Sequence, residues 1–592
     1  MTAQPKYVAF QGGLDQESPA LAIPPGRVLA VKNYECAPSG YRRTQGYERF
    51  DGRPSPAAAT GATATARRNA ITAVPGAGAV RGVLWYENTL YAWRDNVGGT
   101  EAIVHKATSG GWSALNIASI MTFADGGPYV IQDGDTITGG TSGATAVVRT
   151  VAAQADTSWE FGEAMGTLVL ESVTGTFQAD EQLDVGIETF VATVVTIPTA
   201  MSFPPGGRYE FVIRNFYGAT GFERAYGVNG VGTAFEFDGE SAISIQTGMP
   251  DDKPFLIAEH KKHLFLAFPK GSLQNSALGE PRSFSALLGA AEIGLGKEIT
   301  NIIPSTADSL IITTEGSFHA LTGNDSSDFI KADISPTSGA FLRSAQNIGS
   351  VIYMDKSGIR SASTTQAYGG FKLGSYTSLI QKTIDQKIAA GAKVVASMVV
   401  KSKDQYLVFF DDSTGISLFF GRKAPEAMLF SYPFTITCAH IGEDGQKERI
   451  FVGASNGFVY ELNVGISFDG ANISSWMQIA LGHQGAPRVI KRYHHLIFAQ
   501  VGGPNINYVA HPEFDHSNGS QTLSDDIVAA MSGGEGVYTG SDFTGAGPSE
   551  GDAYIDGAGS DLNILLVCDH NDVDDHTIQG VTVLFSPRGA RR

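Results

Sequence analysis

The feature that most constrains the fold of this chain is a repeated strand–turn–strand unit. Its clearest copy is Arg449–Asn463, RIFVGASNGFVYELN, in which two apolar strands flank a Ser-Asn-Gly turn. Asn-Gly between apolar runs is a strong hairpin signal, because both residues tolerate the positive φ of tight turns. Related units lie at Ser309–Leu321, Val351–Ala362 and Gln405–Phe420, with less regular ones at Gly82–Trp93, Tyr209–Phe237 and Leu256–Phe268. Hairpins repeated every 40–50 residues or so predict blades of a β-propeller or a related radial array.

The composition favours many short strands and excludes some functions. The 592 residues include 71 Gly and 25 Pro, which suit frequent turns. The formal net charge of −18 argues against tight, sequence-independent binding of nucleic acid, which needs Lys and Arg to neutralise phosphates. An acidic wall would instead let DNA slide past. The sequence has no apolar run of about 18 residues that predicts a membrane span. We expect the three separated cysteines, Cys36, Cys438 and Cys568, to be buried free thiols.

We predict an all-β chain with three parts: a β-propeller platform, a small inserted β-barrel or sandwich, and a C-terminal β-sandwich. Residues 117–199 are dense in Thr, Val and Gly with alternating apolar positions, which predicts an inserted module of five or six strands. The expected divisions are 1–53 for N-terminal strands that complete the propeller or platform, 54–116 for a linker and the first blade, 117–199 for the insertion, 200–474 for the remaining blades and 475–592 for the sandwich.

Two segments depart from the strand pattern. Residues 54–78 are rich in Ala, Thr and Gly, which predicts a surface loop or linker. The segment SLIQKTIDQKIAA within 372–392 predicts an amphipathic helix with Ser375 or Thr377 as its cap and Gly391 as its stop. Such a helix usually covers a sheet edge or packs on a neighbour, and we assign it no chemistry.

Few residues suggest chemistry. The most suggestive run spans 569–576, where the candidate ligands for a divalent cation are Asp569, Asp572, Asp574 and His576. Because the run lacks EF-hand spacing and the EF-hand glycine, a solvated acidic turn is the simpler interpretation. The sequence contains no Walker loop, H-E-x-x-H motif or sialidase-type Asp box. We therefore predict no enzyme activity, no cofactor and no metal.

A distinctive order of residues fills the first 53 positions: a Gly pair, Pro-Pro-Gly, Asn-Tyr-Glu and then GYRRTQGYERFDG. This order resembles the N-terminus of the β-propeller proteins of short bacteriophage tails, called nozzle, hub or tail tubular protein B. The matching residues are Gly12, Gly13, Pro24, Pro25, Gly26, Asn33, Tyr34, Glu35, Gly40, Tyr41, Arg42, Arg43, Gly46, Tyr47, Glu48, Arg49, Phe50, Asp51 and Gly52. The ending HTIQGVTVLFSPRG is similar to the same family, so the resemblance covers most of the chain and departs at 117–199.

Within this pattern, Arg42 and Arg43 have two interpretations. They could contact phosphate or a partner. Alternatively, they could pair with carboxylates and lock a terminal strand, which is the simpler interpretation. The basic run Lys491–His495 could likewise contact phosphate, or it could form salt bridges between subunits or sheets. The second interpretation is simpler, because alternate residues of a strand point to opposite faces and do not form one basic patch.

The resemblance implies a structural virion protein in the tail of a short-tailed bacteriophage, made in the host bacterial cytoplasm. It implies a homohexameric ring that extends the DNA channel below adaptor or portal-side ring proteins, gates genome ejection and anchors tail fibres or spikes. Genomic DNA would pass through the lumen without sequence-specific binding, and acidic lumen faces would keep it from sticking. The alternatives are a receptor-binding or glycan-degrading tail protein, and a bacterial propeller that scaffolds protein partners.

Overall fold

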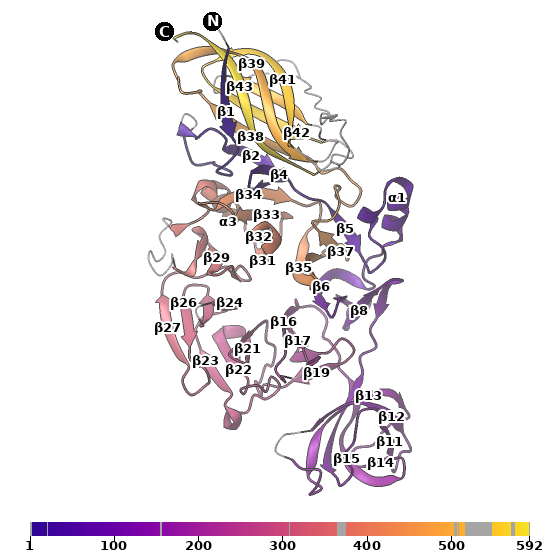
Figure 1. The fold of residues 1–592 in the computed structure, drawn as a ribbon. Coiled ribbons are helices and arrows are strands. Elements are labelled where there is room, and N and C mark those ends of the chain that lie inside the picture. The colour runs from indigo at the N-terminus through magenta and orange to yellow at the C-terminus, as the bar shows by residue number, and fades with distance from the viewer. Residues whose placement is uncertain are drawn as a thin grey trace.

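The computed structural model describes residues 3–19, 22–153, 157–218, 220–306, 308–363, 374–502, 506, 508–514, 548–569 and 575–590. These residues form three β-rich parts arranged along one long axis (Figure 1). A β-propeller lies in the middle, a β-sandwich built from both ends of the chain lies at one end, and a small closed barrel lies at the other. The predicted all-β class with these three parts is confirmed.

Seven antiparallel sheets form the propeller in the described part of the chain. The first four contain β6 (Ala77–Tyr86), β7 (Thr89–Asp95), β8 (Ala102–Thr108) and β9 (Gly111–Ala114); β16 (Glu210–Arg214), β17 (Arg224–Val228), β18 (Ala234–Phe237) and β19 (Ala242–Ile245); β20 (Leu256–His260), β21 (His263–Phe268), β22 (Ser272–Asn275) and β23 (Ala291–Gly294); and β24 (Ile299–Pro304), β25 (Leu310–Thr314), β26 (Phe318–Thr322) and β27 (Ile330–Ser335). The others contain β28 (Gln346–Asn347), β29 (Val351–Asp355) and β30 (Gly358–Ser361); β31 (Val394–Val400), β32 (Gln405–Phe410), β33 (Thr414–Phe419) and β34 (Glu426–Ser431); and β35 (Ile436–Asp444), β36 (Lys447–Ala454), β37 (Val459–Leu462) and β5 (Tyr47–Phe50).

The ring of blades closes on itself. The innermost strands contact one another in chain order, and β35 of the last blade contacts β6 of the first. The outer strand of the last blade comes from the N-terminus, because β5 pairs antiparallel with β37, Tyr47 opposite Leu462. Apolar side chains of neighbouring blades fill the spaces between the sheets, as where Trp85 of β6 stacks on Phe451 of β36.

The sandwich draws on both ends of the chain. One sheet has the order β3 (Tyr34–Ala37), β4 (Gly40–Arg43), β43 (His576–Ala590), β39 (Val489–Gly502) and β41 (Pro548–Gly559), with β1 (Gln4–Ala9) also paired to β43. The other has the order β2 (Val28–Lys32), β38 (Ser475–Gly482), β42 (Leu562–Cys568) and β40 (Val509–Phe514). The expected assignment of residues 1–53 therefore needs correction: β1 to β4 belong to the sandwich, and β5 alone joins a blade. Short strands carry no local signal for partners more than 400 residues away.

The inserted module is a closed six-stranded barrel. Its strands are β10 (Ser119–Gly126), β11 (Thr136–Gly139), β12 (Thr145–Ala153), β13 (Ala164–Thr174), β14 (Gln182–Val185) and β15 (Glu188–Ala200), in the order β10-β13-β12-β11-β14-β15. Alternate residues such as Met121, Phe123 and Leu168 point inward and are fully buried. In sequence the barrel separates the first blade from the second, and in Figure 1 it lies at the end remote from the sandwich.

Helices are few and short in the described residues. Residues 54–78 are not a plain loop, because η2 (Pro56–Ala58) and the Ala-rich helix α1 (Gly61–Ala70) lie there, and Arg68 of α1 pairs with Glu48 of β5 at 2.6 Å. The predicted helix in 372–392 is present as η6 (Ser378–Ile380) and α3 (Gln381–Ala389). The segment before it covers the edge strand β30, since the Tyr376 N–H donates to the Ile359 carbonyl at 2.8 Å. Further 3-10 turns are η3 (Pro269–Gly271), η4 (Ala286–Leu288) and η7 (Lys401–Lys403).

Two other expectations concern the cysteine side chains and membrane-spanning segments. Cys36, Cys438 and Cys568 are buried free thiols, as predicted. Within the described ranges, no helix has the length and apolar character needed to cross a membrane.

Candidate functional site

The N-terminal residues that carry the family resemblance lie in two places: at the junction between the propeller and the sandwich, and around β5, where the ring of blades closes. Gly12 and Gly13 have φ of +95° and +64° and run along blade strand β34, where the Gly12 N–H donates to Glu426 Oε1 at 2.9 Å. Gly26 has φ of +92°, and a Cβ there would lie 1.9 Å from the Ala9 carbonyl oxygen. Only glycine suits such a backbone approach. Pro25 lies beside Gly482 of the sandwich.

Asn33 and Tyr34 join segments that are distant in sequence. The buried Asn33 amide donates to the Ser474 carbonyl at 2.9 Å, and its Oδ1 accepts from the Ser431 N–H of β34 at 3.0 Å. It thus links the propeller to the sandwich. The Tyr34 hydroxyl lies 3.1 Å from Nε2 of His576 within the sandwich core.

Arg42 and Arg43 lock strands together. Arg42 Nε donates to Glu35 Oε1 at 2.8 Å. Arg43 is buried, and its guanidinium donates to the Ser475 hydroxyl at 3.1 Å and to the Ile473 carbonyl at 3.0 Å. These contacts favour the locking interpretation over a phosphate site, and the partners of Arg43 include a hydroxyl and a carbonyl.

The rest of the pattern lies around β5. Tyr47 contacts four aromatic rings and is 2% exposed. Arg49 pairs with Asp469 at 2.5 Å, and Asp51 is fully buried and accepts N–H groups of Arg53 and Thr72, each at 3.1 Å. The flanking glycines, Gly46 and Gly52, lie against the backbone of Ser467 and Thr108.

A buried charge network crosses the same junction, and sequence reasoning missed it. Glu35 of β3 accepts from Lys403 Nζ at 3.0 Å and from Gln405 Nε2 at 3.1 Å, both from the propeller. Burial opposes ionisation of Glu35, but the charges of Lys403 and Arg42 outweigh burial and lower the pKa of this carboxyl. Burial also lowers the pKa of Lys403. Partners 368 residues apart leave no local sequence signal.

The structure places two of the four candidate metal ligands, and Asp572 and Asp574 lie outside the described residues. Asp569 is exposed at the end of β42, whereas His576 is buried, bonded to Tyr34 and stacked on Tyr508. In the described ranges, no group of three His, Cys, Asp or Glu side chains is arranged to hold a metal ion. The basic run of β39 alternates as expected, with Lys491 and Tyr493 buried and their neighbours partly exposed.

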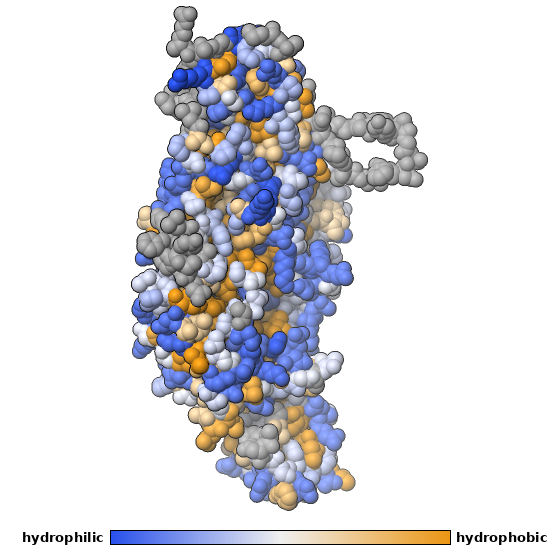
Figure 2. Space-filling view, turned by 60° about the vertical axis from the view of Figure 1, so that its left-hand side comes forward, coloured by the Kyte–Doolittle hydropathy of each residue, from blue (hydrophilic) through white to orange (hydrophobic). Residues whose placement is uncertain are grey.

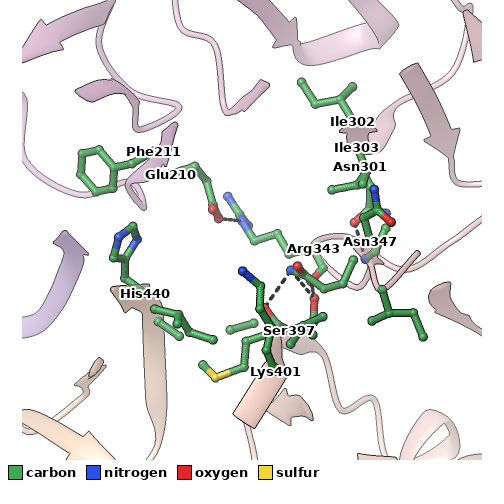
Figure 3. Close-up of a pocket in the computed structure, with 18 of the residues that line it drawn as sticks. Glu210, Phe211, Asn301, Ile302, Ile303, Arg343, Asn347, Ser397, Lys401 and His440 are labelled. Atoms are coloured by element: carbon green, nitrogen blue, oxygen red, sulfur yellow. Dashed lines mark hydrogen bonds and ion pairs between the residues drawn. The ribbon is translucent and has the colours of Figure 1, made fainter. Parts of the chain in front are cut away.

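The propeller encloses a central channel about 970 Å³ in volume. All seven innermost strands contribute to its wall, through Val83, Glu210, Leu256, Asn301, Gln346, Ser397 and His440. Arg343 and Glu210 approach each other across it (Figure 3), with Arg343 Nε 2.6 Å from Glu210 Oε1. Arg208 Nη2 lies 3.3 Å from the same oxygen. One carboxylate therefore ties two arginines of different blades.

The channel chemistry favours a structural role. Partial burial lowers the pKa of Arg208 to about 10, so its guanidinium stays charged at neutral pH and stabilises Glu210. Gln346 Nε2 of β28 donates to the Ser397 carbonyl of β31 at 3.0 Å, which joins two further blades. The Gln346–Ser397 contact therefore joins neighbouring inner strands, whereas the Arg343–Glu210 pair spans the channel. Spacing in the sequence gave no reason to single them out.

The burial of His440 of β35, in the channel wall, can be tested through the pH dependence of stability. Burial lowers its pKa from 6.5 to about 4. Between these values the unfolded chain binds a proton that the folded chain does not, so stability is lost as the pH falls from 6.5 to 4. The loss amounts to at most about 3 kcal/mol. We expect His440→Gln to show a smaller drop in urea midpoint than the native chain between pH 7 and pH 4.5. Identical drops would contradict this burial of His440.

One sequence that resembles a catalytic motif forms a hairpin turn. Residues 453–457 read G-A-S-N-G, which matches the G-x-S-x-G of a nucleophile elbow. However, Ser455 lies in the hairpin between β36 and β37, not between a strand and a helix. Gly457 has φ of +84°, and Asn456 Oδ1 accepts the Phe458 N–H at 3.1 Å. Only Gly457 of this turn takes the left-handed conformation, so the predicted hairpin forms with a different turn from the two-residue Asn-Gly type.

No family model and no curated protein sequence matches the chain. Solved structures with a similar fold include the computationally designed Ika8 protein, at 9% identity over 66% of this chain and 98% of that one, with a TM-score of 0.33. The C-terminal WD40 domain of Sif2 matches at 11% identity, 66% and 97% coverage and a TM-score of 0.30. YCF48 bound to D1 peptide matches at 8% identity, 66% and 95% coverage and a TM-score of 0.27. At these values the likeness carries no functional argument, and the strand topology itself identifies the β-propeller.

Proposed function

We propose that the protein is a structural virion protein of a tailed bacteriophage and that its copies form the nozzle or hub ring of a short tail. The observation that carries the proposal is the N-terminal pattern and the place where its residues lie. The residues of this pattern lie at structural joints: Asn33 links the sandwich to blade strand β34, Arg43 locks β4 to β38, and Tyr47 lies on the strand that closes the propeller. A protein that transmits force along a tail needs such a stiff joint.

The size of the propeller channel bears on where DNA would pass. The channel, about 970 Å³ in volume, is spanned by the Arg343–Glu210 ion pair, whose Nε and Oε1 atoms lie 2.6 Å apart. A duplex therefore does not fit through one propeller. A DNA channel would have to be enclosed between copies of the chain, which favours a ring of protomers over a monomer.

In the proposed ring, the chain is a homohexamer that lies below adaptor or portal-side ring proteins and bears tail fibres or spikes. The net charge of −18 would keep the lumen from holding DNA as it passes, because like charges repel. The proposed role is mechanical and requires no cofactor.

Electron microscopy tests the proposal. We expect the purified protein to form closed rings with six times the 62.5 kDa mass of one chain, as measured by mass photometry. In purified virions, an antibody against the chain should label the distal end of the tail. Absence of the chain from virions would overturn the proposal. Release of reducing ends from host surface polysaccharide would instead favour the glycan-degrading alternative.

A further inference from the structure

The inserted barrel has one end that points away from the propeller. The chain enters at Ser119 and leaves at Ala200, and these two residues are paired. From this end β10, β12 and β14 each run toward the far end. Thr145, the first residue of β12, pairs with Thr174 at the propeller end. Gln182, the first residue of β14, lies nearer the propeller than Val185, its last residue. The loops at 127–135, 157–163 and 186–187, with the first residues of β15 up to Phe190, therefore gather at the far end, which we call the barrel tip.

Each loop of the barrel tip exposes apolar side chains. Ile187 is 94% exposed, Phe161 76%, Phe190 61% and Val130 46%. In Figure 2 the barrel is the lowest lobe, and apolar residues are visible there among polar ones. Single exposed apolar residues are common on soluble proteins, but four on neighbouring loops of one end form a candidate contact surface.

Phe190 is held in an unfavourable conformation. Its φ is +62°, which is rare for a bulky side chain. Its N–H donates to Asp184 Oδ1 at 2.9 Å, which stabilises the turn in this conformation. Such local strain is retained at sites where it positions a side chain for use. Here it keeps an aromatic ring in solvent.

The charge of the barrel is strongly one-sided. Residues 119–200 contain eleven Asp and Glu and one basic residue, Arg149, so the barrel carries −10 of the total −18. Arg149 pairs with Asp238 and Glu240 of the propeller and with Glu171, away from the tip. The exposed acids at the tip alternate with the apolar residues: Asp133, Glu160, Glu163 and Glu188.

We propose that the barrel tip is a docking site for a protein segment that is both basic and apolar. Aromatic anchors surrounded by charges have the anatomy of a protein interface, and a basic partner would complement the acidic rim. A second barrel would bring the same negative charge, and nucleic acid and anionic membranes would be repelled. The inference goes beyond the ring and does not depend on it.

The test uses the full chain and a fluorescein-labelled peptide in which lysine alternates with tryptophan. Fluorescence anisotropy should show binding that weakens as salt rises from about 0.05 to 0.5 M. The triple variant Phe161→Ser, Ile187→Ser, Phe190→Ser should weaken binding at least about tenfold, because it removes the apolar anchors. These side chains are exposed, so the variant is expected to fold, and circular dichroism checks this.

Matched controls separate the tip from other surfaces. Leu287→Ser with Leu288→Ser removes apolar residues that are 97% and 64% exposed on the propeller rim, and it should leave binding unchanged. Glu160→Gln, Glu163→Gln, Glu188→Gln should reduce both affinity and salt dependence. A glutamate–tryptophan peptide should not bind. The proposal is overturned if the acidic peptide binds as tightly as the basic one, or if the triple variant binds the basic peptide normally. It is also overturned if the triple variant changes the oligomeric state of the protein, or if the barrel tip retains phosphatidylglycerol vesicles.

Discussion

Replacing Tyr47 with alanine is expected to lower the free energy of unfolding by about 3–5 kcal/mol, the usual cost of removing a large buried aromatic side chain. Tyr47 lies on β5 and contacts Tyr432, Phe434, Tyr460 and Phe468, with ring centroids 4.7–5.6 Å apart. The loss is concentrated where the N-terminal strand closes the ring. We therefore expect the last blade to open before the rest of the propeller.

Urea unfolding followed by tryptophan fluorescence measures the change, and limited proteolysis of residues 54–76 reports release of β5. Tyr47→Phe is the matched control, because it keeps the ring, and it should cost less than about 1 kcal/mol. A native midpoint for Tyr47→Ala, or an equal loss in both variants, would contradict the closing role of β5.

The sequence predicted the parts of the fold whose signals are local. The hairpins of the blades have apolar strands on either side of Gly-containing turns, as at Gly457, and the barrel alternates inward residues such as Leu168 with outward polar ones. Both patterns depend on residues within about ten positions of each other. The predicted helix near Ile384 also formed, because its apolar residues recur at helical spacing.

The parts that sequence reasoning missed depend on distant partners. The short strands β1 to β4 read equally well as blade or sandwich strands, and only pairing such as Lys32 with Trp476 decides between them. The closed ring of blades brings Glu210 of β16 to Arg343, which precedes β28, across the channel. Helix α1 arose in an Ala-rich segment that we interpreted as a loop, because composition alone does not separate a short surface helix from a linker.

Replacing Glu35 with alanine is expected to destabilise the chain by about 3–5 kcal/mol, because it leaves a buried cation without its partner. Glu35 and Lys403 side chains are each 8% exposed, and their ion pair joins the sandwich to the propeller. Lys403 then keeps only Asn463 Oδ1, at 2.9 Å, among its observed acceptors. Arg42 is less affected because its side chain is 24% exposed and can reach water.

A double variant distinguishes the buried charge from lost packing. Glu35→Met with Lys403→Met should recover most of the loss, since apolar pairs often replace buried ion pairs at little cost. Asp251→Ala, which breaks the exposed Lys253–Asp251 pair, should change stability by less than about 1 kcal/mol. If the double variant is as unstable as Glu35→Ala, or if Asp251→Ala costs as much as Glu35→Ala, the loss does not come from leaving Lys403 unpaired. Recovery would show that the loss in Glu35→Ala comes from the unpaired charge of Lys403 at the junction between the propeller and the sandwich, and not from lost packing.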